Sequence, residues 1–87
     1  VTIIGSYGFN QCKKLTSIPN LGSLESVNQS AFSGCESLAL LGNLRKLTSF
    51  GYLPFYNCPN LVLEVLPDSA AEQYAKNYSM RYTYITE

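Results

Sequence analysis

Phenylalanine and cysteine recur together in this chain every 23 residues. The recurring pairs are Phe9 with Cys12, Phe32 with Cys35, and Phe55 with Cys58, and each pair is followed by a leucine (Leu15, Leu38, Leu61). A period between about 20 and 50 residues is typical of a solenoid, in which successive coils stack, rather than of a globule with one central core. We therefore expect a repeat fold in which equivalent residues lie on each other, so that any function belongs to a surface.

Each repeat combines a short turn with two apolar segments. The Phe–x–x–Cys spacing places both side chains on one face of a helical turn. The first apolar segments (residues 15–18, 38–41 and 61–65) are short enough to be strands of about 4–5 residues. A turn at Pro19–Asn20 or Gly42–Asn43 separates them from a second short strand that ends at Val27 or Phe50. The expected fold is an α/β leucine-rich solenoid of 23-residue coils with short parallel strands and helical turns.

The repeat pattern ends in the third coil. Glu64 occupies the position where Ile18 and Leu41 predict an apolar residue, so we expect the apolar line to be lost there.

The period also runs back to Val1 and Ile4, which match Leu24 and Val27, so the chain begins halfway around a coil. We expect the array to be cut from a longer one. Its first coil would then expose an unpaired strand edge that favours self-association.

The C-terminal segment has the pattern of a cap. Ser69 followed three residues later by Glu72 is the spacing of a capping box, which marks the start of a helix. Apolar residues then fall at helical spacing (Ala71, Tyr74, Ala75, Tyr78), and alternation over residues 81–86 predicts a closing strand. We expect residues 1–66 to form the coils and residues 67–87 to form a helix–strand cap of the same domain.

The composition argues against several classes of function. Six basic and six acidic residues give no net charge, so no basic stripe is available for nucleic acid. Histidine is absent, which removes imidazole as a general base and as a metal ligand. The three cysteines are too far apart in sequence for a CxxC pair. No stretch approaches the roughly 20 apolar residues of a membrane span. We expect no cofactor, no metal and no nucleic acid.

Two groups of residues could carry chemistry. The three cysteines could form a metal or redox site, but stacked thiols at equivalent positions are better explained as small buried apolar groups. The carboxylates could support a glycan hydrolase only if two of them faced each other across a cleft. They are Glu25, Glu36, Glu64, Asp68, Glu72 and Glu87. Because they occupy inequivalent positions of the repeat, we consider an enzyme the least favoured of the function classes.

Tyrosine is the most suggestive residue type for binding. Tyr52 and Tyr56 fall at coil positions that are polar in the other repeats, and Tyr7 falls at one that is polar in the second, so we expect these three side chains at the surface. Tyrosine is enriched in protein interfaces because it gives a large contact area at a low cost in conformational entropy. Tyr74 and Tyr78 are better explained as packing of the cap.

The motifs together resemble the BspA-type, or Treponema-pallidum-type, leucine-rich repeats. The matching segments are SAFSGCESL (Ser30 to Leu38), the LTSI and LTSF stretches (residues 15–18 and 47–50), and the tail from residue 69. Phe9/Cys12, Phe32/Cys35 and Phe55/Cys58 correspond to the AF–x–x–C positions of the family, and Ala31 supplies the alanine where Gly8 and Pro54 do not.

The resemblance implies a secreted or cell-surface protein of a bacterium or a parasitic protist, often involved in adhesion to host or matrix proteins. It offers no shared catalytic site. We therefore expect a non-enzymatic repeat domain that binds a protein ligand. The alternative is a purely structural spacer or cap beside another functional domain, which binds nothing itself.

Overall fold

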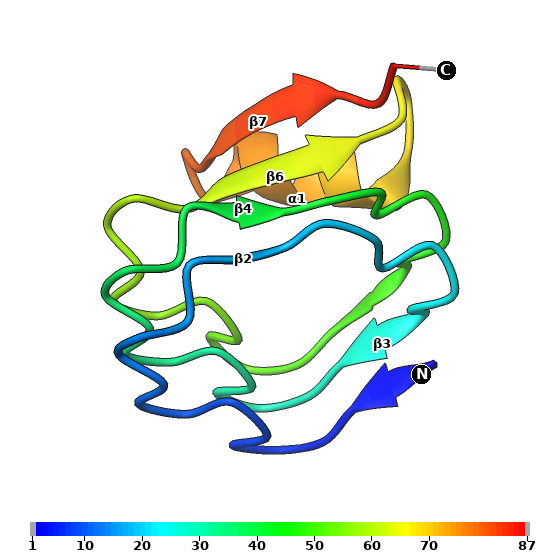
Figure 1. The fold of residues 1–87 in the computed structure, drawn as a ribbon. Helices are drawn as coiled ribbons and strands as arrows, with labels where there is room; N and C mark the ends of the chain where they lie inside the picture. The colour runs from blue at the N-terminus through cyan, green and yellow to red at the C-terminus, as the bar shows by residue number, and fades with distance from the viewer. Residues whose placement is uncertain (1, 87) are drawn as a thin grey trace.

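The computed structural model, which describes residues 2–86, is a solenoid of stacked coils closed at one end by a helix and a strand (Figure 1). The elements in chain order are β1 (Ile3–Ile4), β2 (Ser17–Ile18), β3 (Ser26–Val27), β4 (Leu40–Leu41), β5 (Ser49–Phe50), β6 (Val62–Val65), α1 (Ala70–Asn77) and β7 (Arg81–Tyr84). The expected leucine-rich solenoid with parallel strands and a C-terminal helix–strand cap is confirmed.

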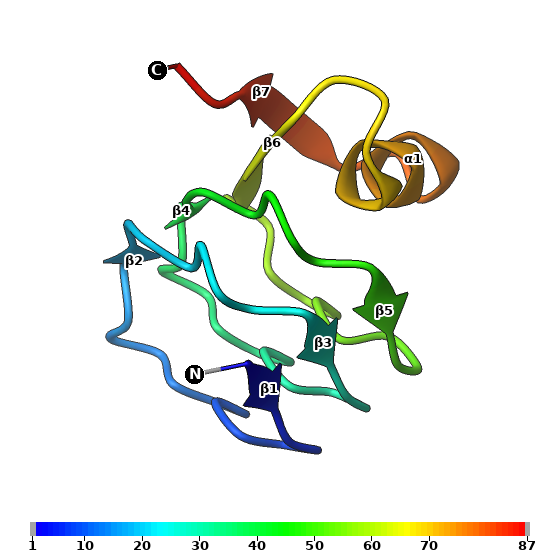
Figure 2. The ribbon, with the colours of Figure 1, turned by 90° about the vertical axis from the view of Figure 1, so that its right-hand side faces the viewer.

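The strands form two parallel sheets on different sides of the coils (Figure 2). One sheet has the order β1-β3-β5 and the other has the order β2-β4-β6-β7. In the first sheet Ile4 pairs with Val27, and Val27 pairs with Phe50. Equivalent residues of the repeat therefore lie side by side, as the 23-residue period predicts.

The strands of the first two coils are shorter than the four to five residues expected. Pro19 directly follows β2, and its missing N–H and fixed φ end the regular pairing. In the next coil Gly42 lies so close to Pro19 that an added Cβ would be 2.3 Å from the Pro19 carbonyl oxygen. The two backbones meet at this corner, and the chain turns away after only two paired residues.

The connections between the sheets are successions of separate turns that do not form helices. The N–H of Cys12 donates to the carbonyl of Phe9 at 3.2 Å, and the N–H of Cys35 donates to that of Phe32 at 3.3 Å. The residue before each cysteine has a positive φ: Gln11 (62°), Gly34 (76°) and Asn57 (61°). A left-handed residue at this position cannot extend a right-handed turn, so each turn stops there.

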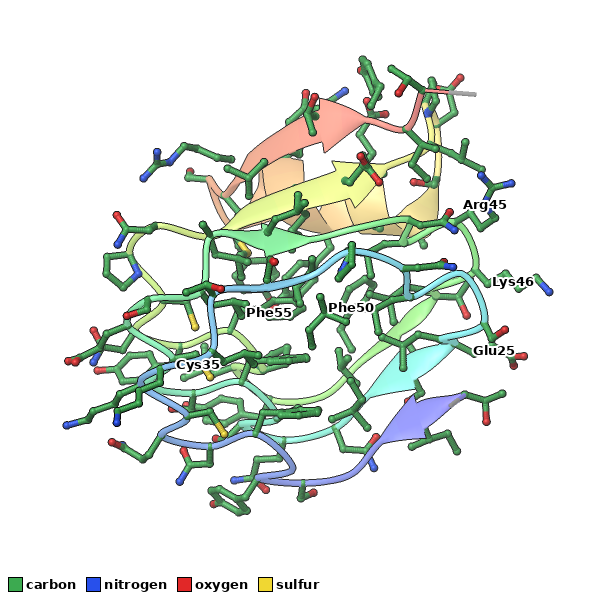
Figure 3. The ribbon with its side chains drawn as sticks, viewed as in Figure 1. Glu25, Cys35, Arg45, Lys46, Phe50 and Phe55 are labelled. Atoms are coloured by element: carbon green, nitrogen blue, oxygen red, sulfur yellow. The ribbon has the colours of Figure 1, made fainter. Side chains whose placement is uncertain are left out.

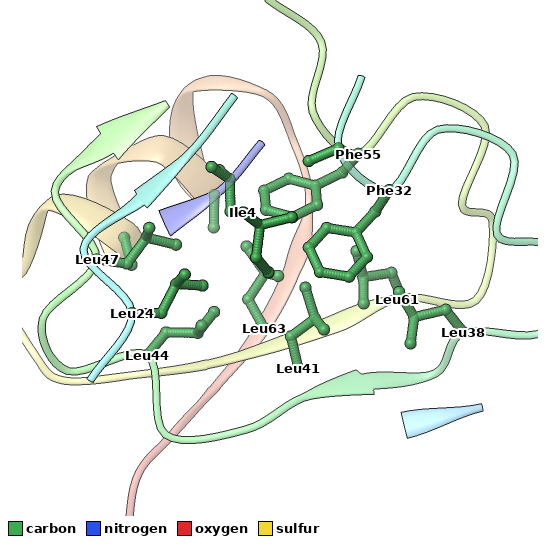
Figure 4. Packing of buried hydrophobic residues seen from close by; sticks show 14 of the residues in the cluster. Ile4, Leu24, Phe32, Leu38, Leu41, Leu44, Leu47, Phe55, Leu61 and Leu63 are labelled. Atoms are coloured by element: carbon green, nitrogen blue, oxygen red, sulfur yellow. The ribbon is translucent and has the colours of Figure 1, made fainter. Parts of the chain in front are cut away.

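The core is a set of columns that run along the stack (Figure 4). The rings of Phe9 and Phe32 stack with centroids 5.2 Å apart, and those of Phe32 and Phe55 with centroids 5.8 Å apart. The second coil lies between two others, and Phe32, Cys35 and Leu38 in it have no exposed surface. The equivalent Phe9, Cys12 and Leu15 of the first coil are only half-buried.

The apolar line is not lost in the third coil, and this expectation was wrong. Leu41 pairs with Leu63, so the repeat is one residue shorter here than in the first two coils. Leu63 therefore occupies the position expected for Glu64. In the third coil the inward residues Leu61, Leu63 and Val65 alternate strictly, as in an ordinary strand, so β6 reaches four residues. Glu64 moves to the outside of the core, where its carboxylate accepts the backbone N–H of Asn43 at 2.7 Å.

The cap covers the far end of the core (Figure 2). Ser69 is the N-cap of α1, and its hydroxyl accepts the N–H of Glu72 at 3.1 Å. The Glu72 carboxylate accepts the N–H of Asp68 at 2.9 Å, one residue before the N–H that a standard capping box uses. Tyr74 stacks on Phe50 with ring centroids 4.1 Å apart, and β7 pairs with β6.

Candidate functional site

The three cysteines lie in one column beside the phenylalanine stack. The Cys35 thiol donates to the carbonyl oxygen of Phe9 at 3.0 Å, and the Cys58 thiol donates to that of Phe32 at 2.9 Å. Burial away from water raises the pKa of Cys35, and it raises the pKa of Cys58 to about 11. Both thiols are therefore protonated near neutral pH and act as hydrogen-bond donors between coils.

All three thiols are free, and within residues 2–86 no group of three potential ligands is placed to hold a metal ion. A nucleophilic thiol is favoured by a lowered pKa, and burial shifts the pKa of Cys35 and Cys58 in the opposite direction. The geometry of the cysteines is that of structural residues.

The predicted contact tyrosines are all exposed, with 54% of Tyr7, 71% of Tyr52 and 61% of Tyr56 accessible to solvent. The Tyr7 hydroxyl accepts the side-chain amide of Gln29 at 3.4 Å, and Gln29 is the repeat equivalent of Tyr52. Tyr7 and Tyr52 therefore lie on the same side of the stack, separated by the second coil. We call these two residues, together with the exposed Tyr56, the tyrosine face.

The charged residues that Figure 3 labels, Glu25, Arg45 and Lys46, lie at the opposite ends of the coils from Cys35. Arg45 donates from Nε to the side-chain oxygen of Asn43 at 2.6 Å. Asn43 in turn donates from its amide to the side chain of Asn20 at 2.8 Å. The contact between Asn43 and Asn20 joins two neighbouring coils on that side.

A cavity of about 380 Å³ lies between the third coil and the cap, and we call it the C-terminal pocket. Phe55, Leu61 and Met80 contribute apolar surface to it. Tyr56 and Tyr78 also line it, and both are largely exposed, at 61% and 59%. Tyr78 was expected to be packed in the cap. Its ring does stack on Tyr74, with centroids 4.4 Å apart, but it lies at the end of α1, where one side of the ring stays open.

Among the described residues that line the C-terminal pocket, Arg81 is the one cation. Arg81 is the first residue of β7, and its Nη2 donates to the carbonyl oxygen of Pro59 at 2.8 Å, which ties β7 to the third coil. Both Arg81 and Pro59 are wall residues. Sequence reasoning missed this site because the two walls come from segments about twenty residues apart. The strand alternation over residues 81–86 was the only available sign that they meet.

A second cavity, of about 360 Å³, lies at the open end of the first coil, and we call it the N-terminal pocket. Its apolar surface comes from Ile4, Phe9, Ile18 and Leu21. These side chains belong to columns that the second coil covers on one side only. The described residues that line this pocket carry no charge.

The carboxylates do not form the paired cleft that glycan hydrolysis needs at either pocket. Among residues 2–86, no aspartate or glutamate lines the C-terminal or the N-terminal pocket. Glu64 and Glu72 bind backbone N–H groups, and Glu72 also accepts the hydroxyl of Tyr84. The hydrogen bond from Tyr84 and that from the Asp68 N–H lower the pKa of Glu72. Glu87 lies outside the described residues.

The comparisons with known proteins give one family match. A family model described as BspA type leucine rich repeat region (6 copies) matches residues 1–86. No curated protein and no solved structure gives a significant match. Within residues 2–86, no helix has both the length and the apolar character that crossing a membrane requires. Proteins of the matched family are typically non-enzymatic, and their repeats commonly serve protein–protein interaction. The match covers nearly the whole chain, and the chain belongs to the BspA-type leucine-rich-repeat family.

Proposed function

We propose that this chain is a non-enzymatic repeat domain that binds a protein ligand through the tyrosine face. The observation that carries the proposal is the exposure of Tyr7, Tyr52 and Tyr56, each more than half accessible to solvent. Tyrosine is among the residues that dominate binding energy at protein interfaces, because its ring is large and has few torsions to order. Tyr52 and Tyr56 occupy coil positions that are polar in the other coils, so exposed rings there give the surface a binding capacity that the repeat itself does not require.

The backbone supports the proposal by fixing two of the tyrosines, Tyr7 and Tyr52, relative to the coil between them. The N–H of Tyr7 donates to the carbonyl of Gln29 at 2.9 Å, and the N–H of Ser30 donates to that of Tyr52 at 3.1 Å. These bonds between coils fix the backbone at Tyr7 and Tyr52 along the stack. A ligand that contacts such a preorganised surface pays little to order it.

The test compares the wild-type protein with a Tyr7→Ser/Tyr52→Ser/Tyr56→Ser variant. Binding to an array of purified extracellular-matrix proteins is measured by biolayer interferometry. The expected result is a loss of binding of at least about tenfold for any wild-type ligand, which is the usual effect of removing interface tyrosines. A matched control, Lys46→Ala/Thr48→Ala/Thr83→Ala, changes three exposed residues outside the tyrosine face and should keep wild-type affinity.

Circular dichroism of both triple variants shows whether the fold is retained. A folded tyrosine variant with unchanged affinity for a ligand of the wild-type protein would contradict the proposal. An array with no wild-type ligand would count against matrix proteins as partners and favour the spacer function.

We further propose that the protein is secreted or attached to the surface of a bacterial cell and takes part in adhesion. The support is the family membership, because BspA-type proteins are often secreted or surface-attached. Protease treatment of intact producing cells tests this directly. Cleavage of the protein without lysis is expected, and full protection with cleavage only after lysis would contradict it.

The open first coil supports a proposal of self-association. Ile4, Phe9 and Ile18 line the N-terminal pocket, and the edges of β1 and β2 at this end lack a neighbouring strand in the described chain. Unpaired edges beside apolar surface favour pairing between chains. Sedimentation at increasing concentration should give a mass above the monomer. A Phe9→Lys/Ile18→Lys variant should be monomeric, and a wild-type monomer at all concentrations would contradict the proposal.

A further inference from the structure

The described walls of the C-terminal pocket combine apolar side chains with one cation, Arg81. The side chains of Phe55, Leu61 and Met80 supply apolar surface, and the exposed rings of Tyr56 and Tyr78 extend it toward solvent. A volume of about 380 Å³ is enough for one large side chain with part of its backbone. Apolar and aromatic surface of this kind favours an apolar or aromatic group of the ligand.

The charge of the pocket selects among such groups. Arg81 is the only charged residue among the described residues that line it, so the pocket is positive. The bond from Arg81 Nη2 to the Pro59 carbonyl holds the guanidinium beside the cavity. A guanidinium has five N–H donors, and this bond uses one of its two terminal nitrogens, so donors remain for a carboxylate. An apolar group with a neighbouring negative charge is complementary to this arrangement.

The N-terminal pocket provides a natural comparison. It has almost the same volume, about 360 Å³, and apolar residues also line it, but it has no charged residue among its described walls. An apolar ligand group could enter either pocket. Only the C-terminal pocket can prefer an acidic ligand over its neutral counterpart.

We propose that the C-terminal pocket binds an acidic peptide segment of a partner protein, with an aromatic side chain between Tyr56 and Tyr78 and an adjacent carboxylate on Arg81. The inference rests on the proposed protein-binding function and names a second, separate contact site for it. Tyr56 belongs to both the pocket and the tyrosine face, so a partner bound on the tyrosine face could continue into the pocket.

Three dipeptides test the two halves of this recognition. N-acetyl-Phe-Glu-amide carries both the ring and the carboxylate. N-acetyl-Phe-Gln-amide has the same shape without the charge, and N-acetyl-Ala-Glu-amide has the charge without the ring. Each is titrated into the ¹⁵N-labelled protein at millimolar concentrations, and amide and Met80 methyl shifts are followed by NMR. The first peptide should shift Asn57, Met80 and Arg81 and bind at least about fivefold more tightly than either of the others.

Two variants separate charge from aromatic contact. Arg81→Gln should bind the Glu and Gln peptides equally, whereas Lys46→Gln, which removes a cation from the other end of the coils, should keep the preference. Because Arg81 also bonds to Pro59, Tyr78→Ser provides a second variant. It should weaken both Phe-containing peptides and leave their affinity ratio unchanged.

Equal binding of the Glu and Gln peptides to the wild-type protein would overturn the proposal. So would shifts that map to Ile4 and Leu21 at the N-terminal pocket, or the absence of shifts at millimolar peptide. A failure of the proposed protein-binding function is detected by a different variant. A Tyr7→Ser/Tyr52→Ser variant does not alter the pocket, so unchanged protein binding in this variant contradicts the tyrosine face while leaving the dipeptide result intact.

Discussion

The thiol of Cys58 donates a hydrogen bond to the carbonyl oxygen of Phe32 at 2.9 Å, which joins the third coil to the second. Cys35 makes the same contact with Phe9, one coil earlier, at 3.0 Å. The phenylalanine of each pair also stacks on its equivalent in the next coil. The Phe–x–x–Cys motif thus stabilises the stack in two ways, through ring packing and through a bond to the backbone.

The state of the Cys58 thiol predicts how stability depends on pH. Burial raises the pKa of Cys58 from an ordinary value of 9.0 to about 11. The folded protein therefore keeps a proton that the unfolded chain releases, so the free energy of unfolding should fall as pH rises from about 9 to about 11. Urea unfolding over this range tests the prediction. Cys58→Ala should be less sensitive to alkaline pH than the wild-type protein, and an identical slope would contradict the prediction.

The phenylalanine stack predicts a difference between two chemically identical substitutions. Phe32 is fully buried between two coils, so Phe32→Ala should lower the free energy of unfolding by about 3–5 kcal/mol. Phe9 is half-buried and has a stacked ring on one side only, so Phe9→Ala should cost clearly less. Denaturant midpoints of the two variants provide the measurement. Equal losses would mean that the second coil is not enclosed by its neighbours.

The close approach of two coils at Pro19 predicts the effect of adding a single carbon. In Gly42→Ala the new Cβ would lie 2.3 Å from the Pro19 carbonyl oxygen, so the backbones must separate. Overpacking of this kind typically costs about 1–3 kcal/mol. Gly5→Ala is the matched control, because nothing lies within 4 Å of its Cβ position. Thermal unfolding of the two variants should separate them clearly, and similar midpoints would contradict the contact.

The cap predicts a sensitivity to acid. The hydrogen bond from Tyr84 and the N–H of Asp68 lower the pKa of Glu72 below its ordinary value of 4.5. The folded state therefore favours the ionised carboxylate. Its stabilising contribution is present above about pH 4.5 and is lost as pH falls through the lowered pKa.

Urea midpoints between about pH 3 and pH 7 test the role of Glu72 in the cap. Glu72→Gln should show a weaker dependence on pH than the wild-type protein, and Tyr84→Phe should lie between the two. Glu36→Gln removes an exposed carboxylate from the second coil and should behave like the wild-type protein. A wild-type pH dependence in Glu72→Gln would show that its carboxylate does not stabilise the cap.

Much of the fold was predictable because each coil repeats the same physical problem. Phe32 and Cys35 must be buried against equivalent residues, and the constant spacing of these residues shows which ones meet. The cap was also predictable, since Ser69 and the apolar residues after it follow the rules for a helix start and a helix face.

The third coil was harder to predict because its repeat is one residue shorter, and nothing in a single sequence marks where that residue is missing. Comparison at a constant period aligned Glu64 with Leu41, whereas the structure aligns Leu63 with it. The alternation of Leu61, Leu63 and Val65 was the available signal. It has the period of a strand, while the apolar residues of the first two coils are three positions apart.

The pockets were not predictable from the repeat. The C-terminal pocket exists because the cap covers the two sheets at the end of the stack but leaves space beside Phe55 and Tyr56. That space depends on the direction in which α1 leaves β6 and on the position of Arg81 at the start of β7. Neither is encoded in the spacing of the phenylalanines and cysteines.

The stacking of the coils in register can be measured most directly by NMR. A nuclear Overhauser spectrum of protein with labelled phenylalanine rings should contain cross-peaks between Phe9 and Phe32 and between Phe32 and Phe55, whose centroids are 5.2 and 5.8 Å apart. It should contain none between Phe9 and Phe55, because the Phe32 ring lies between them. Absence of either predicted cross-peak in the folded protein, or a direct cross-peak between Phe9 and Phe55, would contradict the stacked solenoid.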